Sequence, residues 1–376
     1  MIDFTLLPFD EAIRFFRDKV PLTPDKYRQL TDEAKAKAFT AAGVARMDVL
    51  TDLYTGIDKA IADGTTFADF KKSVKETIEK RGWGGMNPHR LDTIYRTNIQ
   101  GAYQAGHYAQ QTELTGNRPY WQYVAVMDGS VRPLHAIMHR RVMRHDDPWW
   151  RENYPPNGFR CRCTVRSLSQ RELDREKLNV DKNPIPAADP GFRTNPGEAM
   201  GKALTDEQFL RLQSDPKRWT PLIKKTFETY GRPKARDITD YMATSIPLWP
   251  RGKKAAEMYK SGMAGQALTD HVGDPLILND VLIDHLNLDG RERFLPFIAD
   301  VVQNPYEIWL QAEKEKDTGR IMLRKRYISV IRAGKDRPVL LVAESSRGQW
   351  TGYTMLYTDD VGYLDRIRMG ILLYGR

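Results

Sequence analysis

The chain has 376 residues, 41% of them hydrophobic and 10% aromatic, which is enough material for two or three domains with cores of their own. Its 58 Lys and Arg residues against 49 Asp and Glu residues give a net charge of +9, a mild excess that permits contact with nucleic acid without requiring it. No apolar run approaches the length of a membrane helix, and the first 20 residues lack a cleavable signal pattern. These features argue against a membrane segment, and we expect a soluble protein made in the cytoplasm.

Helix signals dominate the first third of the chain. Apolar residues recur at three- and four-residue steps from Phe39 to Ile57, which predicts a long amphipathic helix. A later helix begins at Pro88 and places Arg96 close to its apolar face. We therefore expect a helical arm over residues 1–118.

Residues 119–168 predict a small α+β core with a concentration of chemically active side chains. A strand over Tyr120–Met127 leads into a tight turn, and His135, Cys161 and Cys163 follow. Cysteine and histidine are the ligands that zinc prefers, so these three residues predict one structural zinc. A tetrahedral site needs a fourth ligand, for which the candidates are His139, one helical turn after His135, His145 and Asp146.

Other roles for the same residues stay open. Two cysteines one residue apart do not readily bridge to each other, so we expect reduced thiols. On a strand, one of the two would pack inward as a small hydrophobe while His135 makes a local hydrogen bond. Cysteine-protease chemistry with His135 as the base lacks a visible third residue and an oxyanion loop.

The rest of the chain divides into parts that differ in composition and in predicted secondary structure. Residues 169–200 are polar and rich in Pro and Gly and predict an extended tail of the core, while residues 201–270 predict a helical linker region. Residues 271–376 predict helices followed by an antiparallel meander. The predicted fold class is thus α+β and multidomain: a helical N-terminal arm with a small α+β core, then helices plus an antiparallel sheet.

An ordered series of motifs resembles the Mu F-like minor head proteins of tailed phages, also called head morphogenesis proteins. The resemblance covers roughly residues 1–200 and rests on Arg96-Thr97-Asn98, Asp128-Gly129, Arg132, His135, Asp146-Asp147-Pro148, Tyr154-Pro155-Pro156-Asn157-Gly158 and Cys161-Arg162-Cys163. It implies a protein of the virion, in the capsid interior, that contacts the portal and other capsid proteins. It also suggests that Arg96 pairs with an acid of the core such as Asp128.

The last hundred residues resemble the phage nuclease-type domains of the barnase, EndoU, colicin and RelE kind. The resemblance rests on Ile283 to Leu286, Asn304 to Leu310, the basic strand around Arg324 and Arg326, and Thr351 to Thr354. It implies metal-independent RNA cleavage, which needs a base, cations for the phosphate and an acid. The candidates are His285 and Glu307 as base or acid, Arg326 with Arg324 for the phosphate, and Thr354 for orientation, and no cofactor is expected in this domain.

Strand alternation puts Thr351 and Thr354 on opposite faces unless the strand bulges at Gly352. We favour Thr354 on that ground. Residues 276–376 hold 15 Lys and Arg against 14 Asp and Glu, so this part lacks the charge expected of a tight nonspecific RNA binder.

The sequence is compatible with three alternative functions. The first is a phage minor head protein acting in capsid assembly or genome delivery through contact with the portal. The second is a toxin or effector nuclease that is packaged in the particle and delivered to the recipient cell, with the head domain as its packaging address. The third, a protein that binds the packaged DNA, is supported only by the net charge.

Overall fold

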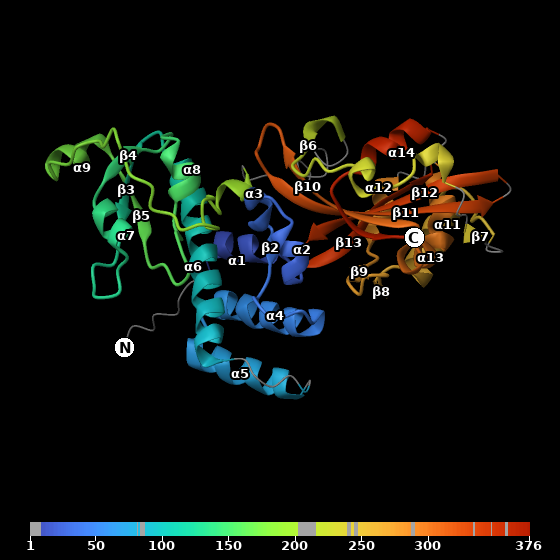
Figure 1. Cartoon of the computed structure of the whole chain (residues 1–376), viewed down its shortest axis with the longest axis horizontal. Coiled ribbons are helices and arrows are strands. Elements are labelled where there is room, and N and C mark those ends of the chain that lie inside the picture. The colour runs from blue at the N-terminus through green and yellow to red at the C-terminus, as the bar shows by residue number, and fades with distance from the viewer. Residues whose placement is uncertain are drawn as a thin grey trace. The chain divides into compact units, whose positions relative to one another are not determined.

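The computed structural model describes residues 9–80, 82, 87–201, 216–238, 242–243, 247–286, 290–333, 335–346, 348–357 and 360–376. The chain divides into two compact units (Figure 1). The N-terminal unit comprises residues 1–27, 38–203 and 318–320, and the C-terminal unit comprises residues 28–37, 204–317 and 321–376. In the described parts, no helix has the length and apolar content needed to cross a bilayer.

Helices form most of the first part of the N-terminal unit. Its elements are α1 (Asp10–Arg17), β1 (Val20–Pro21), α2 (Pro24–Arg28), β2 (Ala38–Phe39), α4 (Met47–Asp63), α5 (Phe67–Lys80) and α6 (Pro88–Glu113); α3 (Asp32–Lys35) belongs to the C-terminal unit. Helix α6 begins with Pro88 at its first position, and the side chain of Asn87 accepts a hydrogen bond of 2.8 Å from the His89 N–H. The buried rings of Phe16, Phe39 and Tyr54 lie against one another at the centre of the helical core. The predicted helical arm is therefore a packed helical bundle.

The predicted α+β core is a three-stranded antiparallel sheet with short helices. Its elements are β3 (Tyr120–Val124), α7 (Pro133–Met138), β4 (Val142–Arg144), α8 (Trp149–Asn153) and β5 (Thr164–Leu168), and the strand order is β4-β3-β5. Aromatic rings fill the space beneath the sheet, where Trp121, Trp150 and Tyr154 pack edge to face and Tyr108 of α6 joins them.

The polar tail that follows the core is held by it. Helix α9 (Gln170–Arg175) begins with a capping box between Ser169 and Glu172, and the short helix η1 (Glu198–Met200) closes the segment. The backbone N–H groups of Ala187 and Ala188 both donate to the buried side-chain oxygen of Asn153. The Pro- and Gly-rich composition therefore describes a segment that is irregular apart from α9 and η1 and is packed against the core.

A nine-stranded sheet organises the C-terminal unit. The order is β14-β10-β11-β12-β13-β9-β8, with β6 paired to β10 and β7 to β11. The strands are β6 (Trp219–Pro221), β7 (Met242–Ala243), β8 (Ala267–Thr269), β9 (Pro275–Ile277), β10 (Glu307–Glu315), β11 (Ile321–Ala333), β12 (Lys335–Ser346), β13 (Gln349–Tyr357) and β14 (Ile371–Gly375). The antiparallel meander β10 to β13 and the α+β class are as predicted.

The helices of this unit lie on both sides of the sheet (Figure 1). They are η2 (Pro216–Arg218), η3 (Phe227–Tyr230), η4 (Ala235–Asp237), α11 (Lys253–Gly262), α12 (Asp280–Leu286), η5 (Arg291–Phe297), α13 (Ile298–Gln303) and α14 (Val361–Ile367). Residues 201–270, expected to be a helical linker, supply β6, β7 and β8, because their short apolar stretches complete sheet edges; residues 202–215 lie outside the described part. The segment is thus part of the fold of this unit.

A bulge in β13 decides which side chains share a face of the sheet. Val342 of β12 faces Thr354, whereas the next residue, Ala343, faces Gly352, so the pairing skips Tyr353. Thr351 and Thr354 therefore lie on the same face, beside Glu344 and Val342 respectively. The bulge whose possibility the sequence left open lies next to Gly352, so strand alternation gives no ground for favouring Thr354 over Thr351.

Candidate functional site

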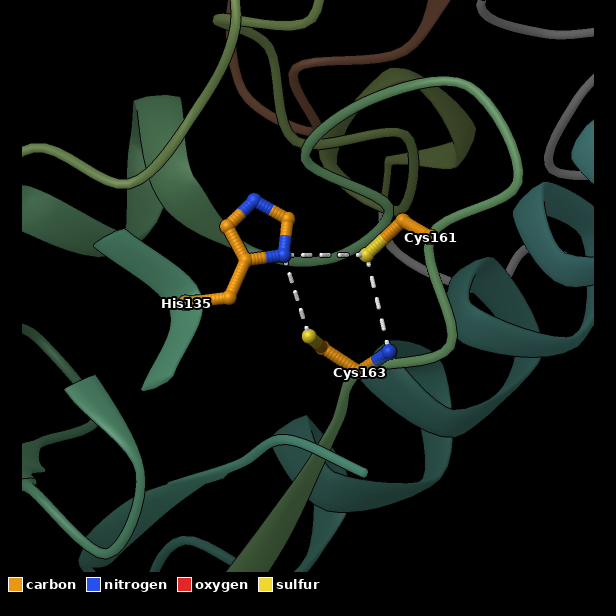
Figure 2. A group of neighbouring side chains, drawn as sticks. All are labelled: His135, Cys161 and Cys163. Carbon is orange, nitrogen blue, oxygen red and sulfur yellow. Dashed lines mark hydrogen bonds between the residues drawn. The ribbon is translucent and has the colours of Figure 1, made fainter. Parts of the chain in front are cut away.

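His135, Cys161 and Cys163 form one buried cluster in the N-terminal unit (Figure 2). The Nδ1 atom of His135 lies 3.8 Å from the sulfur of Cys161 and 3.3 Å from that of Cys163. All three ligand atoms lie within 4.8 Å of one another. The imidazole turns its Nδ1 edge toward both sulfurs, as Figure 2 shows.

The positions of these side chains follow from the local chain. Pro133 at the start of α7 directs the helix that carries His135. The cysteines lie between the buried Asn157 and strand β5, and the Gln100 side chain of α6 donates a 2.8 Å hydrogen bond to the Cys163 carbonyl. Gly158 is closely packed in this loop, since an added Cβ would lie 2.2 Å from the Asp189 carboxylate oxygen and would push that side chain aside.

The donor set fits zinc. Tetrahedral zinc with bonds of about 2.3 Å to sulfur and about 2.0 Å to nitrogen places its ligand atoms roughly 3.5–3.8 Å apart. The thiol of Cys163, assisted by His135, holds the pKa of Cys161 well below its usual range. The Cys161 sulfur and burial raise the pKa of Cys163. A cluster that already favours one thiolate is a suitable ligand for a cation.

None of the three candidates for a fourth ligand joins this cluster. The Nδ1 of His139 accepts a 3.2 Å hydrogen bond from the Ala125 N–H, and the ring of His145 packs near Trp121. Asp146 is exposed and pairs with Arg144 at 3.0 Å. Among the residues that the structure describes, the metal-ligating group consists of His135 and the two cysteines alone.

Tyr123, which the sequence did not single out, lies beside the cluster together with Asn157 of the Tyr154 to Gly158 motif. The phenol of Tyr123 accepts a 3.1 Å hydrogen bond from the side chain of the buried Asn157, and burial together with the Cys163 sulfur raises the pKa of Tyr123. Tyr123 faces inward on β3 by strand alternation, which is the signal that could have identified it.

The expected pairing of Arg96 with Asp128 is wrong. Arg96 binds Asp92, one helical turn away on α6, at 2.7 Å. Asp128 instead receives two hydrogen bonds from Arg162, at 2.5 and 2.7 Å, which lower its pKa to about 2. The nearer helical neighbour wins because an i,i+4 pair needs no tertiary alignment.

A second cluster of charges lies on one face of the sheet in the C-terminal unit. Arg324 pairs with Glu344 at 2.6 Å and with Glu313, and Arg326 pairs with the other oxygen of Glu313. Burial would raise the pKa of Glu313, but the two guanidinium groups outweigh burial and lower it. The cluster thus holds two cations and two carboxylates on adjacent strands.

Some of the residues predicted for catalysis lie at this cluster and others lie apart from it. Arg326 is a member, and Thr354 lies on the same face, opposite Val342, which faces Arg326. The Thr354 hydroxyl lies 3.5 Å from a nitrogen of Arg291. The ring of His285 on α12 lies 4.1 Å from that of Tyr353, the bulge residue. These side chains therefore surround one region of the sheet.

Glu307 lies apart from that region. It is fully buried, and its carboxylate binds Arg368 at 2.6 and 2.7 Å, Arg232 at 2.8 Å and the Trp309 indole N–H at 2.8 Å. Burial acts to raise its pKa, but Arg368 and Arg232 outweigh burial and the pKa is lowered. The carboxylate that joins the arginines is Glu313, six residues along the same strand, and the period-two pattern of β10 could have indicated it.

Two separate parts of the chain match known protein families. Residues 51–166 match the family described as phage Mu protein F like protein, and residues 255–375 match the phage-Barnase-EndoU-ColicinE5/D-RelE like nuclease2 family. The chain therefore carries a Mu F-like domain followed by a phage nuclease-like domain, as the sequence motifs predicted.

Two curated proteins resemble the Mu F-like part. The chain is 42% identical over 191 residues to the "Putative capsid assembly protein F" of Escherichia phage Mu, covering 46% of this chain and 43% of that protein. It is 37% identical over 174 residues to the Mu-like prophage FluMu F protein of Haemophilus influenzae, covering 43% and 42%. The chain thus spans less than half the length of these relatives. No solved structure matches it significantly.

Proposed function

We propose that this protein is a phage minor head protein that acts in capsid assembly or genome delivery. The observation that carries the proposal is the 42% identity over 191 residues with a protein named for capsid assembly. The protein would lie in the capsid interior and contact the portal and other capsid proteins. A phage lacking the gene should yield few filled heads, and the protein should co-purify with portal in wild-type particles; normal heads without it would contradict the assembly role.

We further propose that His135, Cys161 and Cys163 hold one structural zinc in the Mu F-like part. The support is their buried donor set and the spacing of the three ligand atoms. Zinc would join the α7 segment to the loop before β5, where Arg132 at the start of α7 already donates a 2.8 Å hydrogen bond to the Phe159 carbonyl. No metal is expected in the nuclease-like domain.

For the C-terminal unit we propose cleavage of RNA without a metal. In this reaction the ribose 2′-oxygen attacks phosphorus, a base takes its proton, and the 5′-oxygen leaves with a proton from an acid. Glu313 is the candidate base, because its carboxylate stays ionised between Arg324 and Arg326, which bind the phosphate and its developing charge. His285 is the candidate acid, and Thr354 orients the phosphate. Glu307 supports the fold.

A direct test is cleavage of RNA by the purified chain in the presence of chelator. Glu313→Gln, Arg326→Ala and His285→Ala should each lower the rate by on the order of 100-fold. Arg236→Ala, which changes an exposed arginine of η4, serves as the matched control and should leave the rate unchanged. Intact RNA with a folded wild-type chain would exclude the nuclease function and leave head assembly standing alone.

The second candidate function is a toxin or effector nuclease delivered with the particle. The observation that favours it is the division into two compact units, one with the Mu F-like match and one with the nuclease-like match. Fusion of the N-terminal unit to a reporter enzyme should then send the reporter into heads and into infected cells. Reporter confined to the producing cell would contradict delivery.

A further inference from the structure

The segment ahead of the nuclease-like match is built into the same sheet. Residues 217–223, called here the strap, precede the matched residues 255–375. Strand β6 in the strap pairs with β10 so that Trp219 faces Glu315 and Pro221 faces Glu313. Since β14 pairs with β10 only at residues 307–310, the strap occupies the remaining part of that edge.

Specific side chains fasten the strap to β10. Arg218 binds Glu315 at 3.0 Å and Asp317 at 2.5 Å. The side-chain amide of Gln311 accepts from the N–H of Ile223 at 3.1 Å and donates to its carbonyl at 2.9 Å. Arg218 is partly exposed, whereas Gln311, Ile223 and Trp219 are buried, so release of the strap would open one edge of the sheet by local unfolding.

Trp219 covers the charged cluster. The guanidinium carbon of Arg324 lies 4.5 Å from the centre of the Trp219 ring. Trp219 faces Glu315, so strand alternation places it on the face that also carries Glu313 and Arg324. Arg324 is 7% exposed, Glu313 6% and Glu344 4%, so an RNA phosphate cannot reach them in this arrangement.

Two buried polar groups, one on β11 and one on β13, lack a hydrogen-bond partner. They are the Nη2 of Arg324 and the hydroxyl of Tyr353. Buried polar groups are nearly always bonded, and a guanidinium N–H with no acceptor is suited to an anionic oxygen. Tyr353 is the bulge residue of β13, the strand next to the one that carries Glu344. Burial raises the pKa of Tyr353, and the charge of Glu344 adds to that rise.

Building on the ribonuclease function proposed above, we propose that the strap is autoinhibitory: Trp219 closes a phosphate subsite formed by Arg324 and Tyr353, and RNA enters when the strap leaves the edge of β10. The indole lies on the guanidinium where a nucleic-acid base would stack. Opening would also free Arg324 to bind phosphate in competition with Glu344. The strap would thereby hold RNA cleavage by the full chain at a low residual rate.

The first test compares two neighbouring substitutions in the full chain. Trp219→Ala removes the cover and should raise RNA cleavage by at least tenfold and strengthen the binding of a 2′-deoxy dinucleotide that cannot be cleaved. Thr220→Ala, an exposed neighbour on the other face of β6, is the matched control and should change neither. Adding Tyr353→Phe to Trp219→Ala should weaken the gained dinucleotide binding by about tenfold.

A disulfide lock tests the strap without opening the fold. Thr220 and Lys314 face each other across β6 and β10, a spacing that a disulfide spans, so the Thr220→Cys/Lys314→Cys double variant can be closed by oxidation. The two native cysteines are buried in the other unit. The oxidised variant should lose at least nine-tenths of the residual RNA cleavage and regain it with reductant.

The outcomes distinguish failure of the strap proposal from failure of the ribonuclease function. If the wild-type chain cleaves RNA as fast as Trp219→Ala and the lock has no effect, the strap is not inhibitory and the ribonuclease function survives. If nothing cleaves RNA but Trp219→Ala gains dinucleotide binding that depends on Tyr353, the closed subsite stands and the nuclease function fails. Absence of both cleavage and gained binding overturns the proposal.

Discussion

At the scale of single residues, the cysteine cluster makes a testable claim about metal. We expect close to one zinc per purified chain, and Cys161→Ser should release it and lower the Tm, since ligand binding to the folded state adds to its stability. Metal content by elemental analysis and a thermal melt measure both effects. Asp146→Asn is the control, because Asp146 is exposed and paired with Arg144, and it should keep the zinc. A wild-type chain without zinc, together with an unchanged Tm for Cys161→Ser, would indicate that these residues only pack in the core.

Glu307 predicts a stability effect with a defined dependence on pH. Glu307→Gln leaves the fully buried Arg368 without its carboxylate and should cost about 3–5 kcal/mol of the free energy of unfolding. The folded-state pKa of Glu307 lies below its ordinary value of 4.5, so its contribution is present above pH 4.5 and is lost as pH falls through the folded pKa. Urea unfolding from pH 7 downward should show the difference between wild type and variant shrinking in acid. A difference that stays constant with pH would refute the ion-pair account.

At the scale of elements, two glycines of the same sheet predict opposite tolerance to alanine. Gly370, before β14, has φ +128°, and an added Cβ would lie 2.3 Å from the Leu310 carbonyl oxygen. Gly370→Ala should therefore lower stability by about 2–4 kcal/mol, through strain and a backbone clash. Gly352→Ala, at the bulge, meets only side chains at 3.5 Å and is the control, with a change of about 1 kcal/mol or less. Equal unfolding midpoints for the two variants would contradict this reading.

At the scale of the whole molecule, two units with separate cores predict two unfolding transitions. Calorimetry of the full chain should resolve them, with chelator lowering only the transition of the N-terminal unit. Glu307→Gln should lower only the other transition. A single transition that both treatments shift equally would show that the units unfold together.

The sequence by itself determined the order of the parts and indicated His135 and the two cysteines as one candidate site. The motif series ending at Cys161-Arg162-Cys163 and the strand run from Glu307 to Tyr357 are local patterns, and they predicted the α+β class, the two domain resemblances and the histidine–cysteine cluster. Such features depend on neighbours in the chain, so a sequence can carry them. The helix predicted from Phe39 to Ile57 begins later, since Phe39 lies in β2 and α4 begins at Met47.

Only the tertiary structure decided which charges meet. Glu307 and Glu313 share one strand face and look alike in sequence, yet Glu307 is enclosed by Arg232 and Arg368 while Glu313 joins Arg324 and Arg326. The pairing of β6 with β10 brings Trp219 onto Arg324 across about a hundred residues, which no local pattern encodes. Ion pairs and edge pairings are set by strand register and by what packs over each face, and these follow from the energy of the whole unit.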